Sequence, residues 1–244
     1  MISGKRVLAI VPARGGSKGL ERKNIRPMAG SPLVTWPIRA ALNSSFVDRV
    51  ICSTDDREIA SVANQGGADV PFIRPDELAG DLASSADVVI HALDELAKDG
   101  DIFDYVVLLE PTSPLTTNTD IDQALKSLDD SRNHADAIVG ISRVEATHPD
   151  FDVRRGSDGI ITPYAAKDFS SLKRRQDVEE LYFLDGSLYI SDVQVFISRR
   201  SFYHERTMGQ IMPRWKSFEI DEYIDFVCVE AILDRQSEFE STDS

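Results

Sequence analysis

Short apolar runs alternate with longer amphipathic segments over the first 142 residues of this chain. Five of the runs are almost continuously apolar and rich in β-branched residues, which predicts strands covered on both faces, at 7–11, 49–53, 70–73, 105–109 and 137–141. Amphipathic segments near 32–44, 57–65, 84–98 and 119–130 predict helices. This alternation predicts an α/β fold with a doubly wound, mostly parallel sheet, whose ligands bind beyond the carboxyl ends of the strands.

The pattern changes after residue 141. The segment 143–192 is polar and shows strand-like alternation only in short pieces such as 182–190, so we interpret it as a smaller excursion from the sheet. A helix at 193–200, a strand near 210–212 and a last helix over 221–235 should follow. One apolar face of that helix would carry Ile224, Val227, Cys228, Ala231 and Ile232. We therefore divide the chain into an α/β domain (1–142 and 193–236), the excursion (143–192) and a polar, flexible tail (237–244).

The length of 244 residues and a hydrophobic content of 42% suit one compact domain. The first six residues lead directly into a strand-like run, and no apolar stretch approaches the roughly 20 residues of a membrane helix. We therefore expect a cytoplasmic protein without a membrane partner. Cys52 and Cys228 lie in apolar segments, which favours two buried reduced thiols over a disulfide or metal site.

The net charge of −14 argues against a nucleic-acid partner, because such proteins need excess Lys and Arg to displace counterions from phosphate. A small anionic substrate would instead need a local group of cations. The loop after the first strand provides one, with a single acid, Glu21, among five cations: Arg14, Lys18, Arg22, Lys23 and Arg26. Like charges are seldom crowded in this way unless an anion compensates them.

The same loop carries Gly15, Gly16 and Gly19, which allow backbone N–H groups to approach an anion closely. The spacing fits neither the Walker A motif nor the dinucleotide fingerprint. We interpret it as a phosphate-binding loop of another kind; the alternative is a solvated surface loop with incidental charge.

Several short blocks, in order along the chain, resemble the CMP-sialic acid synthetase (acylneuraminate cytidylyltransferase) family. The most specific are Ala13-Arg14-Gly15-Gly16-Ser17-Lys18-Gly19-Leu20 with Lys23-Asn24, Ser53-Thr54-Asp55, Arg74-Pro75-Asp76-Glu77-Leu78-Ala79 with Asp81 and Ala83-Ser84-Ser85, and Leu108-Leu109-Glu110-Pro111-Thr112-Ser113-Pro114-Leu115. Weaker blocks are Arg175-Gln176, Asp185-Gly186-Ser187-Leu188-Tyr189-Ile190 and Glu219-Ile220-Asp221. The resemblance spans about residues 5–235 and implies a Rossmann-like nucleotidyltransferase fold.

The resemblance implies a CTP site formed by the glycine-rich loop and a second segment. Its nucleotide-binding residues would be Arg14, Gly15, Gly16, Ser17, Lys18, Lys23, Asn24, Arg74, Ala83, Ser84 and Ser85. The electrostatic argument agrees, because the four negative charges of a triphosphate require several cations and a metal. Ser84 and Ser85 have an alternative role, since serine commonly caps the N-terminus of a helix and one is expected to begin there.

Glu219 and Asp221 match paired acidic metal ligands of the family, where Asp is usual at both positions. In an extended segment, residues i and i+2 point to one side, and Ile220 between them would turn toward the core. Carboxylate oxygens suit Mg²⁺, which we expect as the cofactor. The alternative is that Asp221 only caps the last helix.

The implied reaction transfers CMP from CTP to the anomeric hydroxyl of a nonulosonic sugar acid and releases pyrophosphate. Positioning and charge neutralisation would carry the catalysis, through the catalytic residues Arg14, Lys18, Lys23 and Asp221. The sugar-binding residues implied are Glu110, Thr112, Ser113, Arg175, Phe183 and Asp185.

The chain departs from the family at the sugar pocket. Glu110 stands where Gln is common, Phe183 stands where an Arg is common, and Phe151 lies near the place of a Lys that follows a His-Pro pair. Losing cations and gaining a carboxylate favours a modified nine-carbon acid of the legionaminic or pseudaminic type over sialic acid.

The segment 143–192 matches the part of the family that forms a homodimer, so Arg174 or Arg175 would act in the neighbouring active site; the alternative is a solvated basic patch. Two other functions stay open at this point. One is nucleotidyl transfer with another NTP or with a sugar phosphate, and the other is non-catalytic nucleotide binding.

Overall fold

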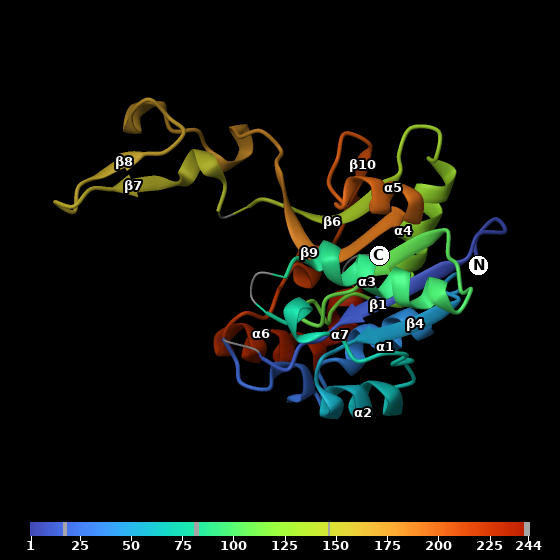
Figure 1. Cartoon of the computed structure of the whole chain (residues 1–244). Helices are drawn as coiled ribbons and strands as arrows, with labels where there is room; N and C mark the ends of the chain where they lie inside the picture. The colour runs from blue at the N-terminus through green and yellow to red at the C-terminus, as the bar shows by residue number, and fades with distance from the viewer. Residues whose placement is uncertain (17–18, 81–82, 146, 242–244) are drawn as a thin grey trace.

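Six strands form the main sheet of the computed structural model, which describes residues 1–16, 19–80, 83–145 and 147–241. In spatial order they are β4 (Arg49–Ser53), β1 (Val7–Pro12), β5 (Tyr105–Leu108), β9 (Tyr182–Asp192), β6 (Ala137–Arg143) and β10 (Thr207–Ile211). Neighbours are parallel except that β9 runs antiparallel to both β5 and β6 (Figure 1). The mostly parallel sheet expected from the sequence is confirmed.

Helices cover both faces of the sheet. In the described part of the chain the α-helices are α1 (Thr35–Leu42), α2 (Arg57–Gln65), α3 (Ser85–Lys98), α4 (Asn118–Asp130), α5 (Val193–Arg199), α6 (Tyr223–Leu233) and α7 (Gln236–Glu240). Two small hairpins lie outside the main sheet, β2 (Pro27–Met28) with β3 (Ser31–Pro32) and β7 (Val153–Arg155) with β8 (Ile161–Pro163).

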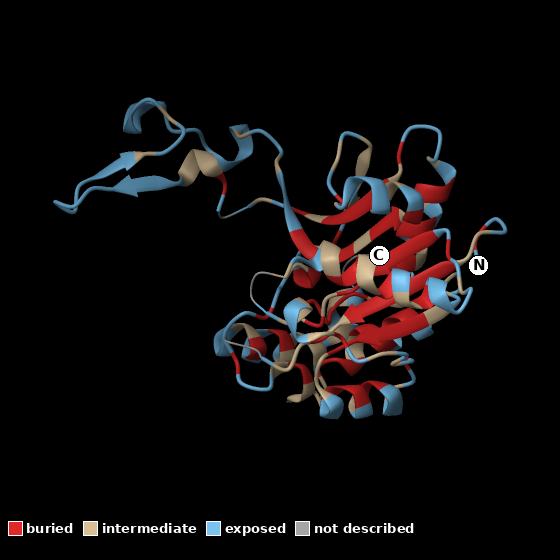
Figure 2. Cartoon of the chain, viewed as in Figure 1, coloured by how far each residue is buried: buried red, intermediate tan, exposed pale blue. Residues whose placement is uncertain are grey.

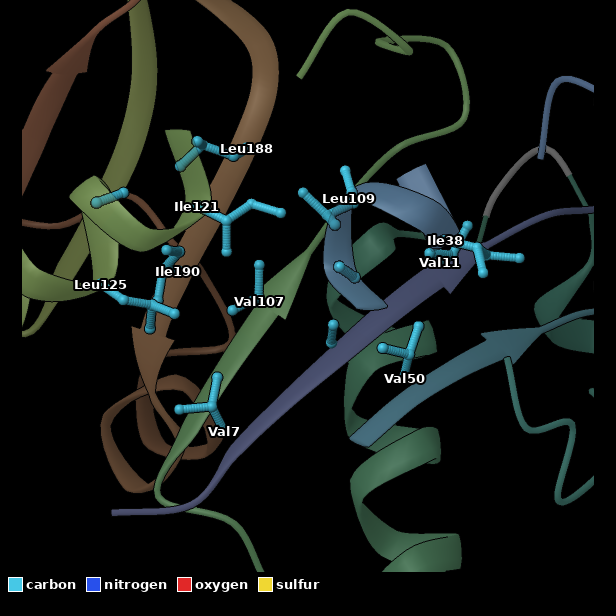
Figure 3. Close-up of a cluster of buried hydrophobic side chains, with 14 of the residues drawn as sticks. Val7, Val11, Ile38, Val50, Val107, Leu109, Ile121, Leu125, Leu188 and Ile190 are labelled. Carbon is cyan, nitrogen blue, oxygen red and sulfur yellow. The ribbon is translucent and has the colours of Figure 1, made fainter. Parts of the chain in front are cut away.

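Strand β1 shows why its sequence is apolar at every position. Val7, Ala9 and Val11 belong to one buried cluster, which also contains side chains of α1, α2 and α4 (Figure 3). Leu8 and Ile10 belong to a second cluster on the other face, together with side chains of α3 and α5. Successive side chains of a strand point to opposite faces, so a strand covered on both sides must be apolar throughout.

The strand expected at 70–73 is not formed. The chain runs beside the edge strand β4, but only a single bridge joins Ile51 to Asp69. Pro71 has no backbone N–H group and cannot donate to a ladder, which gives a physical reason for the early end of the pairing.

The expected excursion is shorter than 143–192, because β9 returns to the centre of the sheet. Val107 pairs with Ile190 on one side of β9, and Ile138 pairs with Ile190 on the other. What projects from the sheet is the segment 144–145 and 147–181, which we call the arm; it contains the β7–β8 hairpin and is mostly exposed (Figures 1 and 2).

The last helix buries a different face from the one expected. Phe226 and Val229 are buried in a third cluster with Leu20, Leu115 and Ile220, among others, and that cluster supports the loop after β1. Ile224 is 62% exposed and Val227 is 43% exposed. The helix is apolar nearly all round, so the sequence contains two apolar faces and does not reveal which one meets the core.

The tail is not wholly flexible. Residues 236–240 form α7, and the ring of Phe239 stacks on Trp215 with centroids 5.7 Å apart.

The prediction of two buried thiols is correct for Cys52, whose burial raises its pKa to about 12, and wrong for Cys228, which is exposed. Within the described residues, no helix combines the length and the apolar character that a membrane span requires.

Candidate active site

Two adjoining hollows lie at the carboxyl ends of β1 and β5, where a doubly wound sheet places its ligands. The first hollow, of about 200 Å³, is lined by Pro12, Arg14, Arg74, Leu78, Gly80, Ala83, Ser85, Val88 and Glu110. The second, of about 510 Å³, is lined by Pro12, Arg14, Gly19, Lys23, Asn24, Glu110, Pro111, Thr112, Asp221 and Glu222. They share Pro12, Arg14 and Glu110, so they form one groove.

Buried hydrogen bonds fix the described parts of the loop after β1. Asn24 is 6% exposed, and its amide donates to the carbonyl of Arg14 at 2.9 Å. The backbone N–H of Gly15 donates to the Asp55 carboxylate at 3.1 Å. Two residues expected to bind phosphate, Ser17 and Lys18, lie outside the described residues. The loop thus presents Arg14 to both hollows on a backbone that is tied to β4 and to its own end.

Lys23 connects this loop to the acidic segment at 219–221. Its Nζ donates to the carbonyl of Ile220 at 2.7 Å. Burial lowers the pKa of Lys23, whereas the nearby carboxylates of Asp221 and Glu110 act to raise it. A side chain at Gly19 would collide with the carbonyl of Asp221. The loop after β1 can therefore approach the acidic segment this closely only because residue 19 is a glycine.

Arg74 forms one wall of the first hollow. Its side chain is 4% exposed, and its Nη2 lies 3.6 Å from Oδ1 of Asp55. Burial lowers the pKa of Arg74, and Asp55 opposes that shift. Within the described part of the chain, its Nε has no hydrogen-bond partner. A buried cation with an unused donor is suited to binding a polar or anionic ligand.

Asp55 is a further candidate site residue, to which the sequence analysis assigned no role. It contacts both Gly15 of the loop and Arg74 of the first hollow, so it orients two binding elements at once. Its position at the carboxyl end of β4, next to β1, was the available signal, since such strand ends are where α/β sheets carry their sites.

The two serines have different roles. Ser84 is the N-cap of α3 and exchanges hydrogen bonds with Asp87 in a capping box, which confirms the structural alternative for this residue. Ser85 lines the first hollow, and its hydroxyl donates to Glu110 at 3.2 Å. Ala83 also lines that hollow.

Glu219 and Asp221 flank Ile220, which is fully buried and donates its N–H to the carbonyl of Thr112 at 2.9 Å. The expected inward orientation of Ile220 is therefore present. The pKa of Glu219 rises to about 7, through burial first and then through Asp221 and other carboxylates. Asp221 does not cap the last helix, because α6 takes Glu222 as its N-cap.

Glycine is needed beside this acidic pair as well. Gly186 has a φ of +69° and lies against Glu219, so any side chain at this position would overlap the carboxylate.

Asp185, which precedes this glycine on β9, accepts two hydrogen bonds inside the protein. The hydroxyls of Ser187 on β9 and of Ser142 on β6 donate to it, each at 2.6 Å. Asp185 is 1% exposed and lines neither hollow, so within one chain it supports β6 and β9.

The remaining residues expected to bind sugar are scattered. Thr112 lines the second hollow, whereas Ser113 is buried in the turn after β5. Phe183 is exposed on β9. Arg175 lies on the arm, in the short helix η5 (Arg175–Asp177), and lines a separate hollow with Phe151. A single chain therefore does not bring Arg175 to the groove.

Comparison with known proteins identifies the family of this chain. The family model described as Cytidylyltransferase matches residues 8–234. The chain belongs to this family. The cytidylyltransferase is 34% identical to the CMP-N,N'-diacetyllegionaminic acid synthase of Legionella pneumophila, over 96% of this chain and 98% of that protein. It is 32% identical to a pseudaminic acid cytidylyltransferase of Campylobacter jejuni, over 88% of this chain and 90% of that protein.

One further relative is longer than this chain, and one solved structure has a similar fold. The N-acylneuraminate cytidylyltransferase of Escherichia coli is 34% identical over 91% of this chain, which spans about half (50%) of that protein. Among solved structures, CMP:2-keto-3-deoxy-manno-octonic acid synthetase in complex with CTP superposes with a TM-score of 0.67, over 95% of this chain and 99% of the other, at 15% identity. At that identity the similarity establishes the nucleotidyltransferase fold.

Proposed function

We propose that this cytidylyltransferase transfers CMP from CTP to the anomeric hydroxyl of a nonulosonic sugar acid and releases pyrophosphate. The observation that carries the proposal is the groove, in which the cations Arg14, Lys23 and Arg74 and the acid Asp221 line two joined hollows at the strand ends. Three similar proteins are named for legionaminic, pseudaminic and acylneuraminic acid. The departures at Glu110, Phe151 and Phe183 favour a legionaminic or pseudaminic type of acid.

Each part of the groove has a role in this proposal. The nucleoside would bind in the first hollow against Arg74 and Ser85, and the triphosphate would extend into the second hollow along Arg14 and Lys23. In-line attack of the sugar hydroxyl on the α-phosphate builds negative charge on the phosphoryl oxygens and on the leaving pyrophosphate. Fixed cations that are partly removed from water neutralise such charge without reorganising. The site would therefore act through positioning and electrostatics.

The acidic pair suits Mg²⁺. Glu219 and Asp221 offer hard oxygen ligands. Burial, and after it the crowding of carboxylates, raises the pKa of Glu219, and a bound cation would relieve that crowding. Within the described residues no group of three or more His, Cys, Asp or Glu side chains could hold a metal ion. We propose that these two carboxylates hold Mg²⁺ together with phosphate oxygens, since this ion commonly uses one or two protein carboxylates. When bound, the ion would add charge neutralisation at the phosphates.

The nucleotide and acceptor can be tested together. We expect pyrophosphate release when the protein is mixed with Mg²⁺, CTP and a legionaminic or pseudaminic type acid, and mass spectrometry should detect the CMP-linked product. ATP, GTP and UTP serve as controls, as do sugar phosphates as acceptors. Release with GTP or UTP but not with CTP would contradict the proposal, and binding of CTP without turnover would favour a non-catalytic protein. The proposal also places the reaction in the cytoplasm, where CTP is made.

We further propose a homodimer in which the arm of one copy lies against α6 and α7 of the other. The arm exposes large apolar side chains, which are Val153, Ile160, Ile161, Tyr164, Phe169 and Leu172. The outer part of the arm, residues 153–175, has six cations and two acids, whereas residues 221–240 have seven acids and one cation. α6 in turn exposes Tyr223, Ile224 and Val227. Complementary charge and two apolar faces left uncovered in one chain support this pairing, which would place Arg174 or Arg175 near the partner's groove.

Sedimentation can test the dimer. We expect the wild-type protein to sediment at about twice its monomer mass of 27.1 kDa. Ile224→Arg should shift it toward the monomer, because it places a cation on the face that would receive the basic outer part of the arm, residues 153–175. Ile102→Arg is the matched control, since Ile102 is 57% exposed in the loop before β5 and lies far from α6 in sequence. Equal sedimentation of the two variants would contradict the proposed surface.

A further inference from the structure

The turn after β4 contacts two separate parts of the groove. The carbonyl of Ser53 accepts a hydrogen bond from the N–H of Ala13 at 3.0 Å, at the start of the loop that follows β1. The carbonyl of Thr54 accepts one from the N–H of Arg74 at 2.8 Å, in the wall of the first hollow. Two successive residues of one turn therefore hold the loop and the wall, and Asp55 is the residue that follows them.

The side chain of Asp55 contacts the same two parts. One oxygen, Oδ1, accepts a hydrogen bond from the N–H of Gly15 at 3.1 Å and lies 3.6 Å from Nη2 of Arg74. The first contact is a hydrogen bond to the loop. The second is too long for a hydrogen bond and is an ion pair with the wall. A single carboxylate oxygen therefore joins the two elements, so a displacement of one disturbs the contact with the other.

The ion pair matters because both partners are largely removed from water. The exposed fraction of the side chain is 4% for Arg74 and 21% for Asp55. Among the described residues, Asp55 supplies the one carboxylate within 4.0 Å of the Arg74 guanidinium. Removing one partner of a buried pair is far more costly than removing one partner of a surface pair. Asp55 lines neither hollow, so it would act on a ligand through Arg74 and Gly15.

The adjacent acid performs the usual structural task of an aspartate in this place. Asp56 is the N-cap of α2, and its Oδ1 accepts the N–H groups of Glu58 at 2.7 Å and Ile59 at 3.1 Å. The helix therefore begins without help from the side chain of Asp55. What this side chain does instead is to join Gly15 to Arg74.

We propose that Asp55 is a positioning residue that couples the two halves of the nucleotide site, holding the Arg74 guanidinium for the nucleoside and the loop backbone at Gly15 for the phosphates. This inference rests on the proposed function, which puts the nucleoside in the first hollow and the triphosphate in the second. The charge of Asp55 serves the nucleoside half, and its ability to accept a hydrogen bond serves the phosphate half. Asparagine keeps the second property and loses the first, so a substitution can separate them.

The test measures the binding of two fragments of CTP, cytidine 5′-monophosphate and pyrophosphate, by calorimetry in the presence of Mg²⁺. Asp55→Asn should raise the Kd of the monophosphate about tenfold, because Arg74 loses its compensating charge, and should change the Kd of pyrophosphate by less than about twofold. Asp55→Ala should raise both Kd values about tenfold or more, because the N–H of Gly15 loses its acceptor as well.

Asp69→Asn is the matched control. Asp69 is 59% exposed and pairs at 2.9 Å with Arg49, which begins β4 at the end opposite to the groove, so neither Kd should change by more than about twofold. A second comparison uses Arg74→Met. Adding Asp55→Asn to this variant should weaken monophosphate binding by less than about twofold, because the charge no longer has its partner.

A merely structural role for Asp55 would raise the Kd of both fragments by the same factor in Asp55→Asn, and that result would overturn the inference. Full additivity of Asp55→Asn with Arg74→Met would overturn it as well. These measurements do not require turnover, so the proposed function is tested separately by product formation from CTP and a sugar acid. If the expected binding pattern appears without product, the proposed function fails and the role of Asp55 stands. If product forms but both fragments respond alike, the inference alone fails, and a wild type that binds neither fragment would contradict both.

Discussion

Asp221→Asn should lower the Mg²⁺-dependent rate of CMP transfer by about 10³-fold, which corresponds to about 4 kcal/mol of lost transition-state stabilisation. Asp221 lines the second hollow and lies beside a lysine that bonds to the adjacent carbonyl. Its backbone N–H donates to Asp225, but its carboxylate is not the helix cap. The substitution keeps the size of the side chain and removes a charged oxygen ligand, so the Mg²⁺ concentration for half-maximal rate should also rise.

The matched control for this experiment is Asp234→Asn. Asp221 precedes α6, whereas Asp234 is exposed at the C-cap of this helix and lines neither hollow, so the same change of charge is made away from the groove. Both variants should keep the wild-type thermal midpoint within about 2 °C, as expected for exposed carboxylates. If Asp221→Asn retains turnover and its Mg²⁺ dependence, the assignment of the acidic pair is wrong.

The position of the cationic loop at the groove could be predicted because its signal is local. Five cations and three glycines within a few residues of a strand end have few purposes other than binding an anion, and Arg14 and Lys23 do line the groove. The inward orientation of Ile220 in the segment 219–221 could be predicted for the same reason, because an apolar residue between two acids is expected to turn toward the core. A local sequence pattern is therefore enough to predict a site where the chemistry and the fold depend on the same few residues.

Other features depend on partners distant in sequence. β9 is the centre of the sheet although its sequence is partly polar, because Asp185 and Ser187 bond to each other inside the protein and Ser142 on β6 completes the set. Such buried polar pairs look like surface residues in a hydrophobicity pattern. The buried face of α6 could not be predicted either, because Ile224 and Phe226 are both apolar and only the fold determines which one is covered.

The segment before the acidic pair is held by a buried ion pair. The Nζ of Lys216 donates to the Asp120 carboxylate at 2.6 Å and to the hydroxyl of Thr117 at 3.2 Å. Lys216 is 7% exposed and Asp120 is 6% exposed. Lys216 ends the short helix η6 (Arg214–Lys216), three residues before Glu219, so this contact ties the acidic pair to the start of α4.

Lys216→Met should therefore lower the free energy of unfolding by about 3–5 kcal/mol, because it leaves the Asp120 carboxylate buried without its cation. Lys126→Met is the matched control on α4 itself: Lys126 pairs with Asp130 at 3.3 Å, both side chains are about two-thirds exposed (68% and 66%), and its loss should cost less than about 1 kcal/mol. Urea unfolding monitored by circular dichroism should show the difference as a lower midpoint at unchanged slope.

The double variant Lys216→Met/Asp120→Leu should recover much of the lost free energy of unfolding, because no buried charge then remains unpaired. Similar midpoints for the two single variants would show that the buried pair does not hold this segment in place.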